Sequence, residues 1–320
     1  MSSLLLLGLI AAPNAAATGL WTELPLDQAL ARARRQGAPV MLDVYADWCG
    51  PCQALDKDVF PDAAVVEEAR AFMAIKLDGE TPEGERIRKR YHVVGYPTVL
   101  FLEPSGAEID RIFGYKPPEE FVQAMRDYRA GRNTVSALRD ELKRRPTDLE
   151  LTFALGRRLA IRGEAAAAEK LLNRVRRADA DNARGLASKA MLTLGKYLYL
   201  RGGGRHEEAL ATLDALRKDH PDSPEARRAL YPIARALHGL GDPEGALARL
   251  QSAIDAAPDD VGGYNTFAWF SFKQDVDRPR GIAVAKAGLA RKPDAAGLWD
   301  TLAELYHATG QRDLAVEAID

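Results

Sequence analysis

The sequence predicts two parts: an α/β domain with a mixed sheet flanked by helices, and then an all-α solenoid of helical repeats. Helix-like and strand-like stretches alternate as far as Gly131, and only helix-length segments follow it. Those segments recur with a period that approaches about 34 residues, which is the pattern of a repeat protein. At 320 residues the chain is long enough for two domains with separate cores.

The α/β part is predicted from the periodicity of its apolar residues. The expected helices carry apolar residues at helical spacing, and the expected strands are short apolar, β-branched runs. A Pro-Ser-Gly turn joins the last two strands into a hairpin. In chain order we expect a helix over 26–37, a strand over 39–46, a helix over 52–60, a strand over 72–78, a helix over 85–93, the hairpin over 98–115 and a helix over 117–131. Such an order gives a mixed sheet with helices on its faces.

The helical part repeats a small residue at one position of each unit. Ala168, Ala209, Ala246, Gly281 and Ala315 are separated by 41, 37, 35 and 34 residues. Small side chains at this position let two helices pack closely, and stacked repeats bury a continuous core. The pattern resembles the tetratricopeptide (TPR) repeat and predicts TPR-like helices over 132–320. We assign four aromatic side chains to the core of these repeats: Trp269, Phe270, Trp299 and Tyr306.

The first residues of the chain predict an export signal. Leu4 to Ala12 form an apolar run, and Ala15 to Ala17 supply the small residues that a signal peptidase prefers. The alternative is a loosely packed tail, since no lysine or arginine precedes the run. We therefore expect a signal peptide over 1–17, domains over 18–131 and 132–320, and a periplasmic or secreted bacterial protein. No other apolar stretch approaches the roughly 20 residues of a membrane helix, so no integral membrane span is expected.

Charge and cysteine content narrow the function. The net charge of −2 suggests neither a nucleic acid nor an anionic membrane as partner. Cys49 and Cys52 are the only cysteines, and the loop between them is too short for their bond to stabilise the fold much. Their spacing favours redox chemistry over a structural disulfide. A zinc site needs about four ligands, whereas this chain has one CxxC and five scattered histidines, so no metal is expected.

The "WCGPC" motif places both thiols at the start of a predicted helix. Free backbone N–H groups and the helix dipole stabilise a thiolate at Cys49, and a thiolate is the attacking species in disulfide exchange. Cys52 lies one turn further in, where we expect it to be more buried and to resolve the mixed disulfide formed by Cys49. Pro51 suits the first helical turn because its missing N–H is not needed there.

Two charged residues in the predicted strands are candidates to assist the thiols. Asp43 lies within an apolar strand six residues before Cys49. Burial there raises its pKa and makes it a candidate proton acceptor for Cys52; the alternative is a solvated aspartate at a strand end. Lys76 in the next strand either lies beside Asp43 and tunes it, or is a solvated surface lysine. Pro97 begins a strand beside the motif, a position at which a cis peptide bond is possible.

These residues together resemble the thioredoxin family over 21–131. The resemblance rests on "DVYADWCGPC", "VVGYPTVLFLEPSG" and "FGY" in this order. Within the family, "VMLDVYADWC" and "KDVFPDAAV" look most like the periplasmic thioredoxin-like C-terminal domain of the DsbD family of thiol:disulfide interchange proteins. The Gly-Pro pair between the cysteines differs and is that of general thioredoxins. The transmembrane part of DsbD is absent from this sequence, so we expect another protein to supply electrons.

The resemblance implies a role for each site residue. It implies a thioredoxin fold with Cys49 as nucleophile, Cys52 as resolving thiol and Asp43 as buried base, and Lys76 falls at the spacing of the family. It implies a cis peptide bond at Pro97. The residues expected to form the substrate groove are Trp48, Gly50, Pro51, Tyr96, Pro97 and Gly114.

Two functions remain open at this point. The first is a thiol–disulfide oxidoreductase, which the sequence favours as a reductase, acting on protein thiols and disulfides and needing no cofactor beyond the Cys49–Cys52 disulfide. Its partners would be an upstream electron donor protein and a protein or peptide ligand in the TPR groove. The second is a TPR scaffold whose thioredoxin-like domain only binds. The intact motif favours the first, while the direction of electron flow depends on a reduction potential that the sequence does not give.

Overall fold

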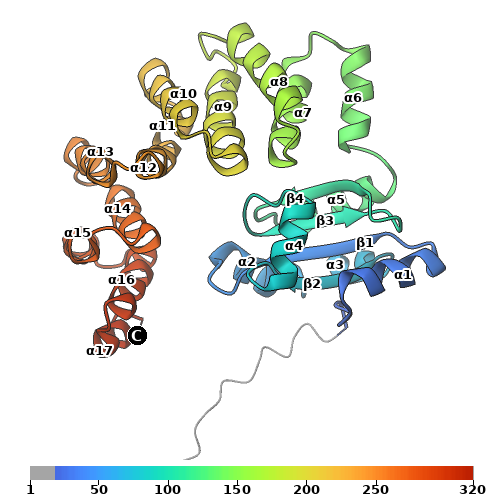
Figure 1. Cartoon of the computed structure of the whole chain (residues 1–320), viewed down its shortest axis with the longest axis horizontal. Helices are drawn as coiled ribbons and strands as arrows, with labels where there is room; N and C mark the ends of the chain where they lie inside the picture. Colours follow the sequence, from blue (N-terminus) through green and yellow to red (C-terminus); the bar gives the residue numbers. More distant parts are fainter. Residues whose placement is uncertain (1–18, 320) are drawn as a thin grey trace, which may run out of the picture. The chain divides into compact units, whose positions relative to one another are not determined.

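The computed structural model describes residues 19–319, so the predicted signal peptide over 1–17 lies outside the described residues. The chain divides into two compact units between Arg145 and Pro146. In Figure 1 all strands belong to the first unit, and the second consists of helices. The sequence-based boundary lies after Gly131, and the difference is α6 (Val135–Arg144), which groups with the first unit.

The first unit is a four-stranded mixed sheet in the order β2-β1-β3-β4. Strand β1 pairs in parallel with β2 and antiparallel with β3, and β3 pairs antiparallel with β4. The predicted α/β architecture is therefore confirmed. Its elements are α1 (Leu26–Gln36), β1 (Val40–Tyr45), α2 (Gly50–Ala54), the π-helical turn η2 (Leu55–Val59), α3 (Ala63–Ala69), β2 (Met73–Asp78), α4 (Pro82–Arg90), β3 (Thr98–Leu102), β4 (Glu108–Phe113), α5 (Pro118–Arg129) and α6.

Alternation along β1 explains which side of the sheet carries the candidate site. Val40, Leu42 and Val44 pack into one cluster with α1 and α4, whereas Met41 packs into the other cluster with η2, α3 and α5. Because side chains alternate across a strand, Asp43 shares the face of Met41. That face is the one covered by the helix that begins at the cysteines.

The second unit is a succession of helix pairs. Its elements are α7 (Leu149–Ile161), α8 (Ala165–Ala178), α9 (Leu186–Thr193), the π-helical η3 (Leu194–Gly202), α10 (His206–Asp219), α11 (Pro224–Arg228), α12 (Leu230–Gly239), α13 (Pro243–Ala256), α14 (Val261–Gln274), α15 (Arg278–Arg291), α16 (Ala296–Ala308) and α17 (Arg312–Glu317). The most extensive contacts within the unit include those of α7 with α8, α12 with α13, and α14 with α15. This is the helical repeat architecture that the sequence predicts.

Small residues act at the predicted points of close approach. Ala168, Ala209 and Ala246 have no exposed surface, and Ala315 is also buried. A Cβ on Gly281 would lie 2.7 Å from the Cβ of Ser271, so only glycine fits between these helices. The small residues that recur once in each repeat therefore mark the points at which neighbouring helices pack closely.

The expectation that four aromatics form the repeat core is correct for two of them. Phe270 and Tyr306 are buried. Trp269 is only partly buried, and Trp299 is 37% exposed, with its indole N–H donating to the Pro293 carbonyl at 2.8 Å. The assignment of Trp299 to the core was wrong, because its side chain lines an open hollow beside α17 together with Asp300 and Glu317. Among residues 19–319, no helix is both long and apolar enough to cross a membrane.

Candidate active site

The two cysteines form a disulfide at the start of α2. Cys49 is the N-cap residue, and the Cα atoms of Cys49 and Cys52 lie 5.2 Å apart. The backbone N–H of Cys52 donates to Cys49 Sγ at 3.2 Å. This places the sulfur of Cys49 where unpaired helix N–H groups stabilise negative charge, as the sequence predicts. Cys49 and Cys52 are 4% and 2% exposed, so the expected difference in burial is small.

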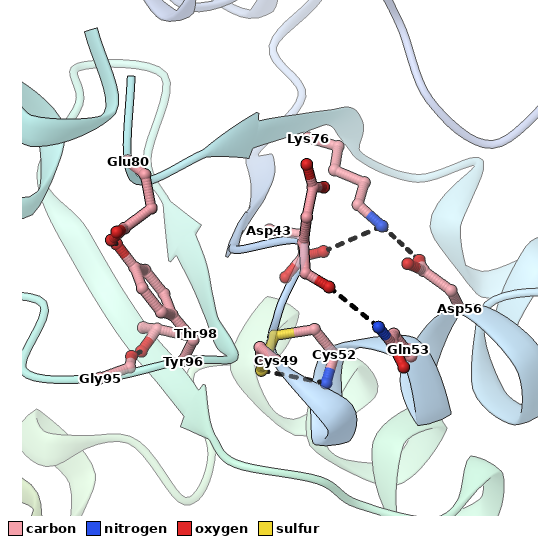
Figure 2. Close-up of a disulfide and its surroundings, with 11 residues drawn as sticks. Asp43, Cys49, Cys52, Gln53, Asp56, Lys76, Glu80, Gly95, Tyr96 and Thr98 are labelled. Atoms are coloured by element: carbon pink, nitrogen blue, oxygen red, sulfur yellow. Dashed lines mark hydrogen bonds and ion pairs between the residues drawn. A yellow bond between two sulfur atoms is a disulfide. The ribbon is translucent and has the colours of Figure 1, made fainter. Parts of the chain in front are cut away.

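A buried acid and a lysine lie beside this helix start. Strand register pairs Asp43 with Lys76 across β1 and β2, and Lys76 Nζ lies 3.7 Å from Asp43 Oδ2. Figure 2 shows Lys76 reaching between Asp43 and Asp56, on the side of the disulfide that faces the sheet. Lys76 also donates to Asp56 Oδ1, and its ammonium lies 4.5 Å from the centre of the Tyr45 ring. The alternative of a solvated lysine is therefore wrong.

Burial dominates the electrostatics of Asp43. The side chain is 1% exposed, and its Oδ1 has no hydrogen-bond partner among the described residues. Desolvation raises the pKa of Asp43 from 3.8 to about 7; Lys76 opposes this rise, and the negative charge of Asp56 adds to it. At neutral pH the carboxyl group is thus close to half protonated, which suits a group that accepts and returns a proton.

The loop before β3 forms one wall of the site. The Tyr96–Pro97 peptide bond is cis. The ring of Tyr96 contacts that of Trp48 edge-on at 5.8 Å, and the Tyr96 hydroxyl donates to Glu80 Oε1 at 2.7 Å. Burial and this bond to Glu80 raise the pKa of Tyr96. Tyr96 also packs against the cluster of Ala46 and the two cysteines, so it lies directly beside the disulfide.

The remaining predicted groove residues lie near these two segments. The N–H of Gly114, at the end of β4, donates to the Pro97 carbonyl at 2.9 Å. Gly114 has a φ of 82°, a left-handed conformation that favours glycine. Gly50 and Pro51 are exposed in the first turn of α2, and Trp48 is 48% exposed. The structure therefore brings the predicted site residues together around the disulfide.

Two carboxylates of the site were missed by sequence reasoning. Asp56 lies four residues after Cys52, which places it one helical turn further along the same face, and that spacing could have suggested it. Glu80 follows β2 in a loop, and no local pattern predicts that it meets Tyr96. The described residues contain no group of three or more histidine, cysteine, aspartate or glutamate side chains able to hold a metal ion.

The arrangement can perform disulfide exchange. A sulfur at a helix N-terminus can be held as a thiolate, a second sulfur lies within bonding distance, and a carboxyl group with a pKa near neutrality lies behind them. Exposed Trp48, Gly50 and Pro51 leave a surface on which another polypeptide can rest.

Comparison with known families matches each part of the chain separately. Residues 26–129 match the thioredoxin-like domain. Residues 200–266 match the tetratricopeptide repeat. Both predicted resemblances are confirmed: the chain carries a thioredoxin-like domain followed by TPR repeats.

Two named relatives are each similar over about a third of this chain or less. The thiol:disulfide interchange protein DsbD of Klebsiella pneumoniae is 36% identical over 109 residues, which are 33% of this chain and 18% of that protein. DsbD 1 of Pseudomonas aeruginosa is 38% identical over 91 residues, covering 28% of this chain and 15% of the relative. The chain therefore spans less than a fifth of the length of these relatives.

One solved structure is also similar in sequence to part of this chain. A putative disulphide-isomerase from Bacteroides thetaiotaomicron is 36% identical, with a TM-score of 0.32. The aligned region covers 34% of this chain and 90% of that one.

Proposed function

We propose that this protein, with its thioredoxin-like domain and TPR repeats, is a thiol–disulfide oxidoreductase that reduces disulfides in other proteins. The observation that carries the proposal is the Cys49–Cys52 disulfide at the start of α2, with the buried carboxyl group of Asp43 behind it. A TPR scaffold with an inert first domain would need neither a pair of bonded cysteines nor a buried acid beside it.

The reaction runs in two exchange steps. In the reduced protein, the Cys49 thiolate attacks one sulfur of the substrate disulfide, that disulfide breaks, and one substrate thiolate leaves. The Cys52 thiolate then attacks Cys49 Sγ, the mixed disulfide breaks, and the second substrate thiolate leaves. The substrate gains two electrons, and Cys49 and Cys52 lose them as their disulfide forms. A dithiol of an upstream donor protein returns two electrons for the next cycle.

Asp43 serves the second step. Cys52 must lose its proton before it can attack, and the ionised Asp43 carboxylate is the proposed acceptor of that proton. Lys76 holds this carboxylate from one side at 3.7 Å, while its tighter contact with Asp56 prevents it from fully neutralising Asp43. The groove residues Trp48, Tyr96, Pro97 and Gly114 would hold the substrate backbone beside Cys49.

The test compares two single cysteine variants with the wild type. The reduced full-length protein is mixed with an excess of a disulfide-bonded protein such as insulin, and the loss of its disulfides is measured. We expect activity in the wild type and none in Cys49→Ser. Cys52→Ser should accumulate a mixed disulfide through Cys49, visible on non-reducing gels. If the wild type reduces no insulin disulfides and Cys52→Ser forms no mixed disulfide, the protein is instead a TPR scaffold.

The direction of electron flow is tested by redox titration of the wild type. A reduction potential near that of thioredoxin, about −270 mV, supports a reductase, whereas a value near about −120 mV would mean an oxidant.

We further propose that the protein is exported to the periplasm, on the grounds of the N-terminal apolar run and the similarity to DsbD. Cell fractionation with N-terminal sequencing tests this, and an uncleaved cytoplasmic protein would contradict it.

A further inference from the structure

The Tyr96 ring beside the disulfide is held by a residue that the two exchange steps do not use. The ring packs against the cluster of Ala46 and the two cysteines. Figure 2 shows it extending from the loop before β3 to the carboxylate of Glu80. The Tyr96 hydroxyl donates to Glu80 Oε1 at 2.7 Å, so the outer end of the ring is fixed by the loop that follows β2.

Arg88 in α4 holds both partners of this hydrogen bond. Its Nη1 lies 3.3 Å from Glu80 Oε1, and its guanidinium carbon lies 5.3 Å from the centre of the Tyr96 ring. A guanidinium beside a carboxylate and over an aromatic ring stabilises the placement of each. Burial and the bond to Glu80 raise the pKa of Tyr96, so its hydroxyl stays protonated and remains a donor at neutral pH.

The backbone that carries Glu80 packs directly against α4 and against the Tyr96 ring. A Cβ on Gly84, in the first turn of α4, would collide with the Asp78 carbonyl oxygen. A Cβ on Gly79 would lie 2.5 Å from Cε1 of Tyr96. The N–H of Glu80 also donates to Asp78 Oδ1 at 2.9 Å. Glu80 therefore projects from a closely packed turn, and Gly79 leaves the space that the ring fills.

We propose that Glu80 is a positioning residue that, with Arg88, holds the Tyr96 ring as an ordered wall of the groove and so favours disulfides in polypeptides over small disulfides. The proposal rests on the proposed function, because it concerns the substrate groove of the same reaction. A polypeptide must rest on the groove while its disulfide meets Cys49, and a wall that is already ordered lowers the entropic cost of binding. A small disulfide reaches the Cys49 thiolate without resting on the wall.

The test measures how fast the reduced full-length protein is oxidised by insulin and by bis(2-hydroxyethyl) disulfide. Samples are quenched with acid and alkylated, and the fraction still reduced on gels gives second-order rate constants. Glu80→Ala removes the acceptor and Tyr96→Phe removes the donor, so each should lower the rate constant with insulin about fivefold. The rate constant with the small disulfide and the reduction potential should stay as in the wild type, because the sulfurs and Asp43 are unchanged.

Three further variants show whether Glu80 acts through the ring. The double variant Glu80→Ala/Tyr96→Phe should lose no more than either single variant, because both changes remove the same hydrogen bond. Glu80→Gln keeps an oxygen that can accept from Tyr96, so it should retain most of the rate with insulin. Gly79→Ala leaves both bonding groups in place but displaces the ring, so it should also slow the reaction with insulin.

The matched control is Glu85→Ala. Glu85 is an exposed carboxylate of α4 that pairs with Lys89 at 2.8 Å, and its loss should change the rate constant with insulin by less than about 1.5-fold. Thermal unfolding followed by circular dichroism verifies that every variant folds.

Four results would overturn the positioning role of Glu80. They are an unchanged rate with insulin in Glu80→Ala, equal losses with the two disulfides, an equal loss in Glu85→Ala, and losses that multiply in the double variant. A wild type that reduces neither disulfide would instead refute the proposed function, and the positioning role with it. The small disulfide thus distinguishes failure of the exchange reaction from failure of the groove.

Discussion

Asp43 is the residue at which stability and the proposed chemistry conflict. Its carboxyl group is buried on the face of β1 that meets α2, and only Lys76 offsets the loss of hydration. In the unfolded chain the group ionises near 3.8, but in the folded protein its pKa is about 7. The folded protein therefore binds more protons between these values, and its stability falls as pH rises from about 4 to about 7. A solvated carboxylate would avoid this cost but would accept a proton poorly at neutral pH.

Replacing Asp43 with asparagine should remove this pH dependence. The rise in pKa from 3.8 to about 7 corresponds to about 4 kcal/mol. Above pH 7 we expect Asp43→Asn to be more stable than the wild type by up to that amount, with little difference at pH 4. The release of a preformed mixed disulfide should slow by about a hundredfold, since no base remains for Cys52.

Urea unfolding between pH 4 and pH 8 measures the stability, and rapid mixing measures the release. The control is Asp47→Asn, an exposed carboxylate nearby, which should leave both quantities nearly unchanged. Equal stability of Asp43→Asn and wild type at pH 8 would show that Asp43 is not held at a raised pKa.

At the scale of elements, one strand residue explains why α6 belongs to the first unit. Asp110 on β4 is fully buried, and its two carboxylate oxygens accept hydrogen bonds from the N–H groups of Arg111 and Val135, each at 2.8 Å. Val135 is the first residue of α6, so a carboxylate from the sheet satisfies a helix N–H that would otherwise lack a partner. The hydrogen bond from Val135 to Asp110 joins residues that are 25 positions apart in the sequence. The local change of pattern at Gly131 does not reveal such a contact, so it suggested a boundary before α6.

Asp110→Ala should therefore release the start of α6. Loss of two buried charge-assisted hydrogen bonds should destabilise the first unit by about 2–6 kcal/mol. In hydrogen exchange, the amides of α6 should lose protection, while those of β1 should lose little. As the control, Asp127→Ala removes a more accessible carboxylate that accepts from Arg132 at 3.0 Å and should cost at most about 1 kcal/mol. Unchanged protection of α6 in Asp110→Ala would mean that this bond does not hold the helix.

At the scale of the whole molecule, local patterns predicted the architecture, while the details of the site depended on contacts between distant segments. Alternating and helical periodicities identified both units, and the CxxC spacing alone located the disulfide. The pairing of Lys76 with Asp56, and of Glu80 with Tyr96, needs the register of β1 and β2 and the path of two loops. A sequence pattern carries no information on such register, so neither pairing could be predicted, although the spacing from Cys52 could have suggested that Asp56 lies near the site. Trp299 shows the same limit, because its periodic position was right for a helix and wrong for the core.

The two units should also unfold separately. Three hydrophobic clusters lie wholly within residues 19–145, and two others lie wholly within 146–319. A unit with its own core can melt without its neighbour. We therefore expect two unfolding transitions in calorimetry. The transition of the first unit, which contains the sheet, is the one whose melting temperature should depend on pH through Asp43. Raising the pH from about 4 to about 7 should lower the melting temperature of that unit through Asp43.

The helical unit supplies the internal reference for this experiment. In Asp43→Asn the melting temperature of the first unit should no longer fall through Asp43 as pH rises. The melting temperature of the helical unit should behave as in the wild type. Fragments over 19–145 and 146–320 should each reproduce one of the two transitions. A single transition that moves as a whole in Asp43→Asn would show instead that the units are energetically coupled. In that case ligand binding to the helical unit would also change the stability of the redox site.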